Sequence, residues 1–253
     1  MSGNRSAGDD RSVAEKVFAI ADAFGTGAEL SLSDIAQRAN LPLSTAHRLL
    51  AEWVEWGGIV RGDDGLYRVG MRLWKLGVRA PTARRMRMVA LPFLEDLYEV
   101  TRENVHLAIR DGLGALYLER FSGRGAVPVI SEVGSRLPLH ATGVGLVLLA
   151  WSPPDVLTEL VASGPRKYLP NTMVTERELR PRLAEIRATG MAQSVNELTV
   201  DSFSAAAPIR DQTNEVIAAV SIVAHADRSA DPQYAAAVGV ASRGISRALG
   251  WRS

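Results

Sequence analysis

The stretch LSDIAQRANLPLSTAHRLLAEW, residues 32–53, contains two short amphipathic segments separated by a turn. Ser31 precedes the first segment and Asp34 follows three residues later, which is the spacing of a short helix-capping box. Asn40 ends this helix, and Pro42 suits the first turn of the next one, where its missing N–H is not needed. The stretch therefore predicts two helices joined by a tight turn.

The second of these helices is expected to be apolar on one side and polar on the other. Its apolar face consists of Leu43, Ala46, Leu49, Leu50 and Trp53. Its polar face consists of Ser44, Thr45, Arg48 and Glu52, with His47 at the margin. Small hydroxyl groups permit close approach to a DNA duplex, and an arginine one turn into the helix can reach a base edge or a phosphate. The two helices predict a helix-turn-helix, in which Ser44, Thr45, His47 and Arg48 are candidate DNA contacts.

The segments on either side support the same interpretation. Apolar residues recur at three- and four-residue steps over residues 12–24, which predicts a preceding helix. Residues 59–69, IVRGDDGLYRV, alternate apolar with polar around Asp64-Gly65, a dipeptide favoured in tight hairpins. This hairpin is expected to form a wing. Its Arg61, Tyr67 and Arg68 are candidate contacts to the sugar-phosphate backbone or the minor groove of DNA. The order of these elements predicts a winged helix-turn-helix DNA-binding domain over residues 12–70.

The charge distribution fits a nucleic-acid partner. Residues 36–90 hold ten lysines and arginines against four acidic residues, a local net charge of +6, whereas the whole chain carries +1. Arginine dominates this region, which suits bidentate contacts to phosphate or guanine. A GC-rich genome would produce the same preference for arginine over lysine, so the clustering is the more informative observation.

Length and composition exclude several other classes of protein. A chain of 253 residues suits two domains or one large domain. The absence of cysteine excludes disulfides, thiolate metal sites and a cysteine nucleophile. The longest apolar run, residues 144–151, is too short to span a membrane. Residues 1–11 are polar, fit neither a signal nor a transit peptide, and are expected to form a disordered tail. A cytoplasmic protein without a membrane partner is expected.

Residues 71–83 are expected to form a linker helix. Its leucines and Trp74 need an apolar partner, and the same helix in a second copy is the simplest one, so a homodimer is expected.

From residue 84 to 250 the pattern changes to alternating helices and strands. Strands are expected near residues 105–110, 115–120, 127–133, 202–211 and 215–225, and helices near 90–101, 140–151, 175–190 and over the last twenty residues. An α+β domain follows, with an antiparallel sheet and helices on one side of it.

With these elements in place, the sequence resembles the isocitrate-lyase-regulator (IclR) family of bacterial transcription factors. Four stretches carry the resemblance: SVAEKVFAIADAF, the helix-turn-helix followed by YRVG, LPLHATGVGLVLLA, and SFSAAAPIRD with EVIAAVSIVAH. The resemblance implies a winged helix, a dimerising linker helix and a GAF-like α+β effector-binding domain. It also implies a homodimer or a dimer of dimers, a pseudo-palindromic operator in the bacterial nucleoid, and, most often, repression of a catabolic operon.

The family's ligand pocket, read onto this sequence, falls at Gly143, Val144, Ser194, Ser204, Ser221 and Val223. Backbone N–H groups at a helix start and strand serines suit a carboxylate or a hydroxyl. Many relatives carry a lysine where Leu146 stands, a cysteine near Ser204 and an acidic residue near Ser194. These departures favour an aromatic or bulkier carboxylic acid as effector over a two- or three-carbon acid. The alternative is that these small residues serve only packing.

The sequence leaves room for few other functions. An enzyme is not expected, because the four histidines have no metal-ligand spacing and the chain lacks phosphate-binding, hydrolase and paired-carboxylate motifs. The prediction therefore includes no catalytic residue, no metal and no cofactor. A DNA-bound protein that senses no ligand remains an alternative, and so does an IclR-type activator.

Overall fold

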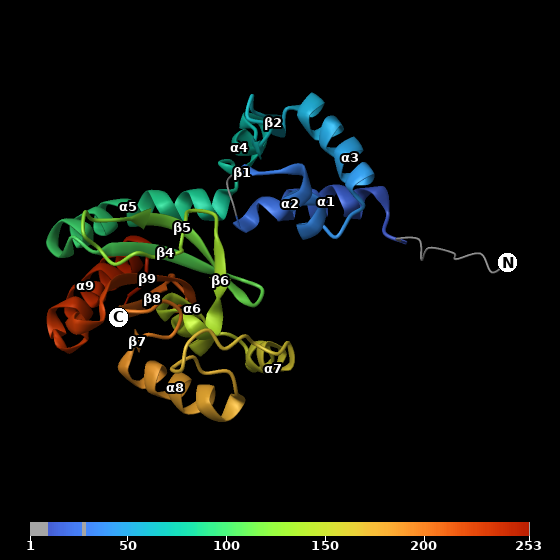
Figure 1. The fold of residues 1–253 in the computed structure, drawn as a ribbon. Helices are drawn as coiled ribbons and strands as arrows, with labels where there is room; N and C mark the ends of the chain where they lie inside the picture. The colour runs from blue at the N-terminus through green and yellow to red at the C-terminus, as the bar shows by residue number, and fades with distance from the viewer. Residues whose placement is uncertain (1–9, 27–28, 253) are drawn as a thin grey trace. The chain divides into compact units, whose positions relative to one another are not determined.

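The first of two compact units, residues 1–81, is a winged helix (Figure 1). The computed structural model describes residues 10–26 and 29–252, so most of the expected disordered tail lies outside the described residues. The elements of this unit are α1 (Val13–Ala23), a 3-10 helix (Phe24–Thr26), β1 (Glu29–Leu30), α2 (Leu32–Arg38), α3 (Leu43–Trp56), β2 (Ile59–Arg61), β3 (Tyr67–Val69) and α4 (Met71–Gly77). The strands form an antiparallel sheet in the order β1-β3-β2.

Local signals in the sequence set the helix ends. The hydroxyl of Ser31 accepts a hydrogen bond from the Asp34 N–H, and the Asp34 side chain accepts one from the Ser31 N–H, so the predicted capping box is confirmed. Helix α3 begins after Pro42 and ends at Gly57, whose φ of +77° is favoured only for glycine. The largest fully buried side chains of this core are Ile20, Ile35, Leu49, Leu50 and Ile59.

Two details of this unit differ from expectation. Leu43, assigned to the apolar face of α3, is 53% exposed, because it is the first helical residue and lies ahead of the turns that pack on the core. The linker helix expected over residues 71–83 is shorter than predicted. Helix α4 stops at Gly77, the N–H groups of Arg79 and Ala80 close a turn, and Pro81 then starts a new helix.

The second unit, residues 82–253, is built on one six-stranded sheet. Its elements are α5 (Pro81–Thr101), β4 (Asn104–Asp111), β5 (Gly114–Phe121), β6 (Arg136–Pro138), a 3-10 helix (Leu139–Ala141), α6 (Gly143–Ala150), α7 (Pro154–Ala162), α8 (Glu176–Thr189), β7 (Ala192–Val195), β8 (Ser202–Arg210), β9 (Val216–His225), a second 3-10 helix (Ala226–Ala230) and α9 (Pro232–Ala248). The strand order is β6-β5-β4-β9-β8-β7, with every neighbouring pair antiparallel.

The α+β class is confirmed, but helices cover both faces of this sheet instead of one. Phe203, Ala205 and Ala207 of β8 belong to the core formed with α5 and α9. Ala206 of the same strand belongs to the core formed with α6, α7 and α8. Strands β8 and β9 are rich in alanine, so helices can approach both faces closely.

Residues 127–133, called the strap below, were predicted to form a strand, and this is wrong. The strap belongs to no strand of the sheet; side chains of the sheet hold its backbone instead. Asn104 Nδ2 donates to the Val127 carbonyl at 2.8 Å, and Arg120 Nη1 donates to the Ser131 carbonyl at 2.7 Å. The alternation of VPVISEV therefore reflects a segment with one side turned inward and one outward, not a paired strand.

Candidate functional site

The start of helix α3 presents the residues predicted to contact DNA. Ser44, His47 and Arg48 are exposed, and Thr45 is half-buried. Arg48 Nη1 lies 2.7 Å from Glu52 Oε1 one turn along, an exposed ion pair that is easily exchanged for a phosphate or a base edge. The sequence missed Leu43, whose exposed side chain lies at the same helix start and offers apolar contact to a thymine methyl group.

The wing differs from expectation in one residue. The prediction that Tyr67 is available to DNA is wrong for its ring, because the side chain is 4% exposed and belongs to the core of the first unit. The Arg61 guanidinium lies 5.5 Å from the centre of that ring and is exposed. The sequence could not show that Tyr67 is buried and Arg61 exposed, because a strand of three residues is too short to reveal which of its faces is buried.

Arg68, also predicted to contact DNA, is held by two carboxylates of its own unit. Its Nε donates to Glu29 Oε1 at 2.8 Å, and its Nη2 to Asp64 Oδ2 at 2.5 Å. These bonds tie β1 and the wing turn to β3. The pKa of the Asp64 carboxyl is lowered to about 2, mainly by the hydrogen bond from the Arg68 guanidinium and further by the one from the Leu66 N–H. A phosphate contact at Arg68 therefore has to replace existing ion pairs, whereas one at Arg61 does not.

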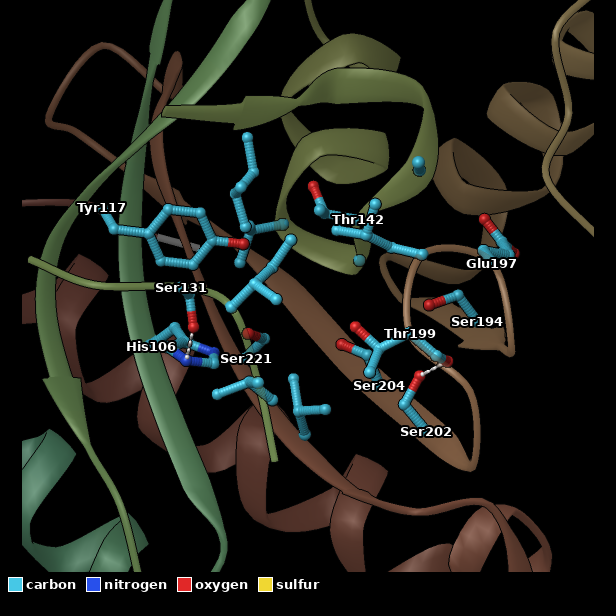
Figure 2. Close-up of a pocket in the computed structure, with 18 residues that line it drawn as sticks. His106, Tyr117, Ser131, Thr142, Ser194, Glu197, Thr199, Ser202, Ser204 and Ser221 are labelled. Atoms are coloured by element: carbon cyan, nitrogen blue, oxygen red, sulfur yellow. Dashed lines mark hydrogen bonds between the residues drawn. The ribbon is translucent and has the colours of Figure 1, made fainter. Parts of the chain in front are cut away.

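In the second unit, the six residues predicted to bind an effector line a single pocket: Gly143, Val144, Ser194, Ser204, Ser221 and Val223. The volume of this cavity is about 50 Å³. The pocket is thus narrow, and Figure 2 shows side chains closing on it from the sheet, from α6 and from the strap.

The register of the sheet explains how these residues meet. Ser194, Ser204 and Val223 are direct neighbours across β7, β8 and β9. In the next row Ala206, Ser221 and His106 are direct neighbours across β8, β9 and β4. The two rows lie two residues apart, so their side chains point to the same face of the sheet and form the floor of the pocket.

Helix α6 begins directly above this floor. Thr142 is its N-cap and accepts a hydrogen bond from the Gly145 N–H at 3.1 Å. A Cβ added at Gly143 would lie 2.5 Å from Ser204 Oγ, which is too close for any real contact. Only glycine lets the helix start approach β8 this closely, and the N–H groups of Gly143 and Val144, ahead of the capped Gly145, have no acceptor in the helix backbone. The arrangement offers hydrogen-bond donors to an anion.

Several polar residues of the pocket were not predicted from the sequence: His106, Tyr117, Ser131, Thr142, Glu197, Thr199 and Ser202. The hairpin of β4 and β5 was expected, and alternation along it gives the shared face of His106 and Ala108. The sequence did not show which face carries the pocket. Ser131 reaches the pocket from the strap, and Glu197 from the turn after β7, where sequence periodicity is lost.

Glu197 is the acidic residue that lines the pocket. Its side chain is 7% exposed, and its Oε2 is buried without a hydrogen-bond partner among the described residues. Burial raises the pKa of this carboxyl to about 7, although Arg182 on α8 acts in the opposite direction. The carboxyl is therefore partly protonated near neutral pH and can act there as a hydrogen-bond donor.

Two further properties of the described residues bear on function. Residues 10–26 and 29–252 contain no group of three or more His, Cys, Asp or Glu side chains placed to hold a metal ion. Within those same ranges, no helix combines the length and the apolar character needed to cross a bilayer.

Comparison with known proteins agrees with this architecture. The family model described as "IclR helix-turn-helix domain" matches residues 13–63, and "Bacterial transcriptional regulator IclR C-terminal" matches residues 79–247. HTH-type transcriptional regulator XynR of Escherichia coli (strain K12) is 32% identical over 243 residues, 94% of this chain and 96% of the relative. HTH-type transcriptional repressor AllR of Klebsiella pneumoniae is 32% identical over 231 residues, 89% of this chain and 85% of the relative.

Solved structures show the same fold. An IclR homolog from Microbacterium hydrocarbonoxydans, complexed with 4-hydroxybenzoate, superposes with a TM-score of 0.85 at 36% identity, covering 94% of this chain and 99% of that one. The IclR protein of Thermotoga maritima superposes with a TM-score of 0.70 at 29% identity, covering 94% and 98%.

The winged helix and these relatives define a DNA-binding transcriptional regulator. The α+β unit that follows the winged helix matches the C-terminal domain of IclR regulators. The chain belongs to the IclR family of bacterial transcriptional regulators.

Proposed function

We propose that this regulator is a repressor of a catabolic operon, and that a small aromatic carboxylic acid in the pocket of the second unit releases it from DNA. The observation that carries the proposal is the pocket itself. The start of α6 and the hydroxyls of Ser194 and Ser204 line the pocket together with apolar side chains such as Val129, Leu137 and Val223. Such a site suits an anionic group attached to an apolar body.

The relatives support the same effector class and the same sign of regulation. The Microbacterium hydrocarbonoxydans homolog is complexed with 4-hydroxybenzoate, and the Klebsiella pneumoniae relative AllR is a repressor. The departure from the family pattern at Ser204 favours a bulkier acid in the same way, whereas Leu146 is fully buried in the core around α6 and does not line the pocket.

The proposal includes a homodimer, or a dimer of dimers, on a pseudo-palindromic operator. Met71, Trp74 and Leu76 of α4 are each more than half exposed in the single chain. Apolar side chains this exposed on one short helix support a second copy as their partner. We propose that the DNA-contacting surface consists of Ser44, Thr45, His47, Arg48 and Arg61. Arg68 joins this surface once its guanidinium leaves the carboxylates of Glu29 and Asp64.

A titration of the purified protein tests the effector class. Isothermal calorimetry with 4-hydroxybenzoate, benzoate, glyoxylate and pyruvate is expected to show binding of at least one aromatic acid and weaker binding of the two short acids. A matched variant, Ser204→Val, removes the hydroxyl below the helix start and is expected to weaken that binding by about tenfold or more. Full-length protein that binds none of these acids would favour the regulator that senses no ligand.

A further inference from the structure

A second cleft lies at the other end of α6 from the pocket described above. Helix α6 begins at Gly143, which lines that pocket, and ends at Ala150, roughly 10 Å further along the helix axis. Around this end, residues of α7 and α8 complete a cavity of about 200 Å³. The residues that line this cavity, called the α8 cleft below, do not line the first pocket.

The lining of the α8 cleft is largely apolar. Leu149, Leu157 and Leu183 contribute to it, and each is less than a tenth exposed. Pro153 and Pro154, at the start of α7, line it as well, and neither has a backbone N–H to donate. The start of α7 therefore offers few backbone donors to an anion, and side chains have to supply them.

Two arginines on one face of α8 bring positive charge to this cleft. Arg180, Leu183 and Arg187 are spaced by three and four residues, so they lie on the same side of the helix. Arg187 Nη1 donates to the Ala150 carbonyl at 2.8 Å, which fixes its guanidinium beside the end of α6. Arg180 pairs with Glu176 one turn earlier, and both of these side chains are exposed.

Both guanidinium groups can bind a further anion. A guanidinium has five N–H groups, and within the described part of the chain Arg187 uses one of them, in its bond to Ala150. The exposed pair of Arg180 and Glu176 contributes little to stability, so a more highly charged anion can replace it. Among the described residues that line the cleft there is no carboxylate, so its lining carries two positive charges and no negative one.

The charge and the apolar lining together define the class of ligand. A phosphate monoester carries about −1.5 to −2 charges at neutral pH, which matches two guanidinium groups. Arginine binds phosphate oxygens through paired hydrogen bonds. The volume of the cleft has room for a body about the size of a substituted six-membered ring. Inorganic phosphate would leave the leucines uncovered, and a neutral apolar molecule would leave the guanidinium groups without an anion.

We propose that the α8 cleft is a second ligand site, which binds a phosphate monoester with an apolar body. Arg180 and Arg187 hold the phosphate, and Leu149, Leu157 and Leu183 contact the apolar body. This site does not depend on the function proposed for the first pocket, because the two share no lining residue.

Calorimetry on the full-length protein tests the site, with phenyl phosphate as the probe at about pH 7.5, above the second pKa of phosphate. Wild type is expected to bind phenyl phosphate at least about tenfold more tightly than inorganic phosphate or phenol, because each of these lacks one half of the ligand. Arg180→Gln is expected to weaken binding by about tenfold, since it removes a charge-assisted hydrogen bond.

Arg177→Gln is the matched control, because Arg177 is exposed on the same helix, makes the same change in charge and does not line the cleft. It should bind phenyl phosphate like wild type, and so should Ser204→Val in the first pocket. Equal weakening in Arg177→Gln and Arg180→Gln would overturn the inference, because the probe would then respond to net charge alone. A loss confined to Ser204→Val would place the probe in the first pocket and overturn it too.

The comparison of the three probes needs wild type alone, so the inference stays falsifiable if a variant folds poorly. Wild type that does not bind phenyl phosphate, or that binds inorganic phosphate or phenol as tightly, would contradict it. The function proposed for the first pocket is tested with other ligands, so the failure of one site leaves the other standing.

Discussion

At the scale of single residues, Glu197 makes effector binding depend on pH. Ionised Glu197 would repel a carboxylate in the same pocket, whereas protonated Glu197 is neutral. Its pKa of about 7 is raised by burial, and Arg182 on α8 is the charged group that opposes the shift. His106 and Tyr117, the other titratable groups of the pocket, are neutral in this range because burial moves their pKa values away from it. Affinity for an acid should therefore fall as pH rises through 7.

The variant Glu197→Gln tests this, because the amide imitates the protonated acid at every pH. The Kd of wild type for 4-hydroxybenzoate is expected to rise about tenfold between pH 6 and pH 8, and the Kd of the variant to stay constant. Glu132→Gln, at an exposed position of the strap, should follow wild type. Identical pH profiles for wild type and Glu197→Gln, measured by calorimetry, would show that the carboxyl does not face the ligand.

Among single residues, Tyr67 and Leu43 show where sequence patterns failed. An aromatic residue in a basic hairpin was predicted to face DNA, but it fills the core. A leucine at a helix start was predicted to be buried, but it is exposed. Both errors arise at the ends of short elements, where one or two residues cannot define a periodicity.

At the scale of elements, the contact between α6 and β8 forms the carboxylate end of the pocket. Gly143→Ala places a Cβ 2.5 Å from Ser204 Oγ, 3.2 Å from Ser204 Cβ and 3.3 Å from Ala206 Cβ, so the hydroxyl must rotate and the helix start must shift by a few tenths of an ångström. We expect a loss of about 1–3 kcal/mol in the free energy of unfolding and a loss of 4-hydroxybenzoate binding. Gly25→Ala, whose Cβ would meet nothing within 4 Å, should change neither quantity. Thermal unfolding and calorimetry measure the two effects, and wild-type binding by Gly143→Ala would contradict this role for the helix start.

Helix α3 and the wing should contribute differently to DNA binding. Arg48→Ala is expected to weaken binding to the preferred site by roughly 1–3 kcal/mol and to relax base choice, because it removes a groove contact. Arg61→Ala should weaken binding to all sequences and reduce the salt dependence of log K by about one, as expected for a phosphate contact. Fluorescence anisotropy at several salt concentrations separates the two. Wild-type affinity in both variants would show that α3 is not the recognition helix.

At the scale of the whole molecule, a dimer should impose its symmetry on the operator. Two winged helices related by a twofold axis read two inverted half-sites, spaced by about one helical turn of DNA or a multiple of it. Footprinting of a site selected from random DNA by the full-length protein is expected to show paired protection. Protection of a single isolated half-site would contradict the dimeric mode of binding.

Much of the architecture was predictable from the sequence, because local signals agree with the fold. The capping box at Ser31 and the proline at 42 marked the starts of the two helices of the helix-turn-helix, and the six pocket positions came from the resemblance to the family. The strap and the polar residues His106, Ser131 and Glu197 were not predictable as a site. Their juxtaposition depends on strand register and on loops held by side chains, which leave no period in the sequence.

The central claim is that an acid bound in the second unit controls DNA binding by the first. The most direct measurement is the affinity of the full-length protein for its selected DNA site, with and without saturating 4-hydroxybenzoate, in wild type and in Ser204→Val. We expect the ligand to weaken DNA binding of wild type by about 5- to 150-fold and to leave the variant unaffected. Unchanged DNA affinity of wild type, at a concentration where calorimetry shows the acid bound, would contradict the account.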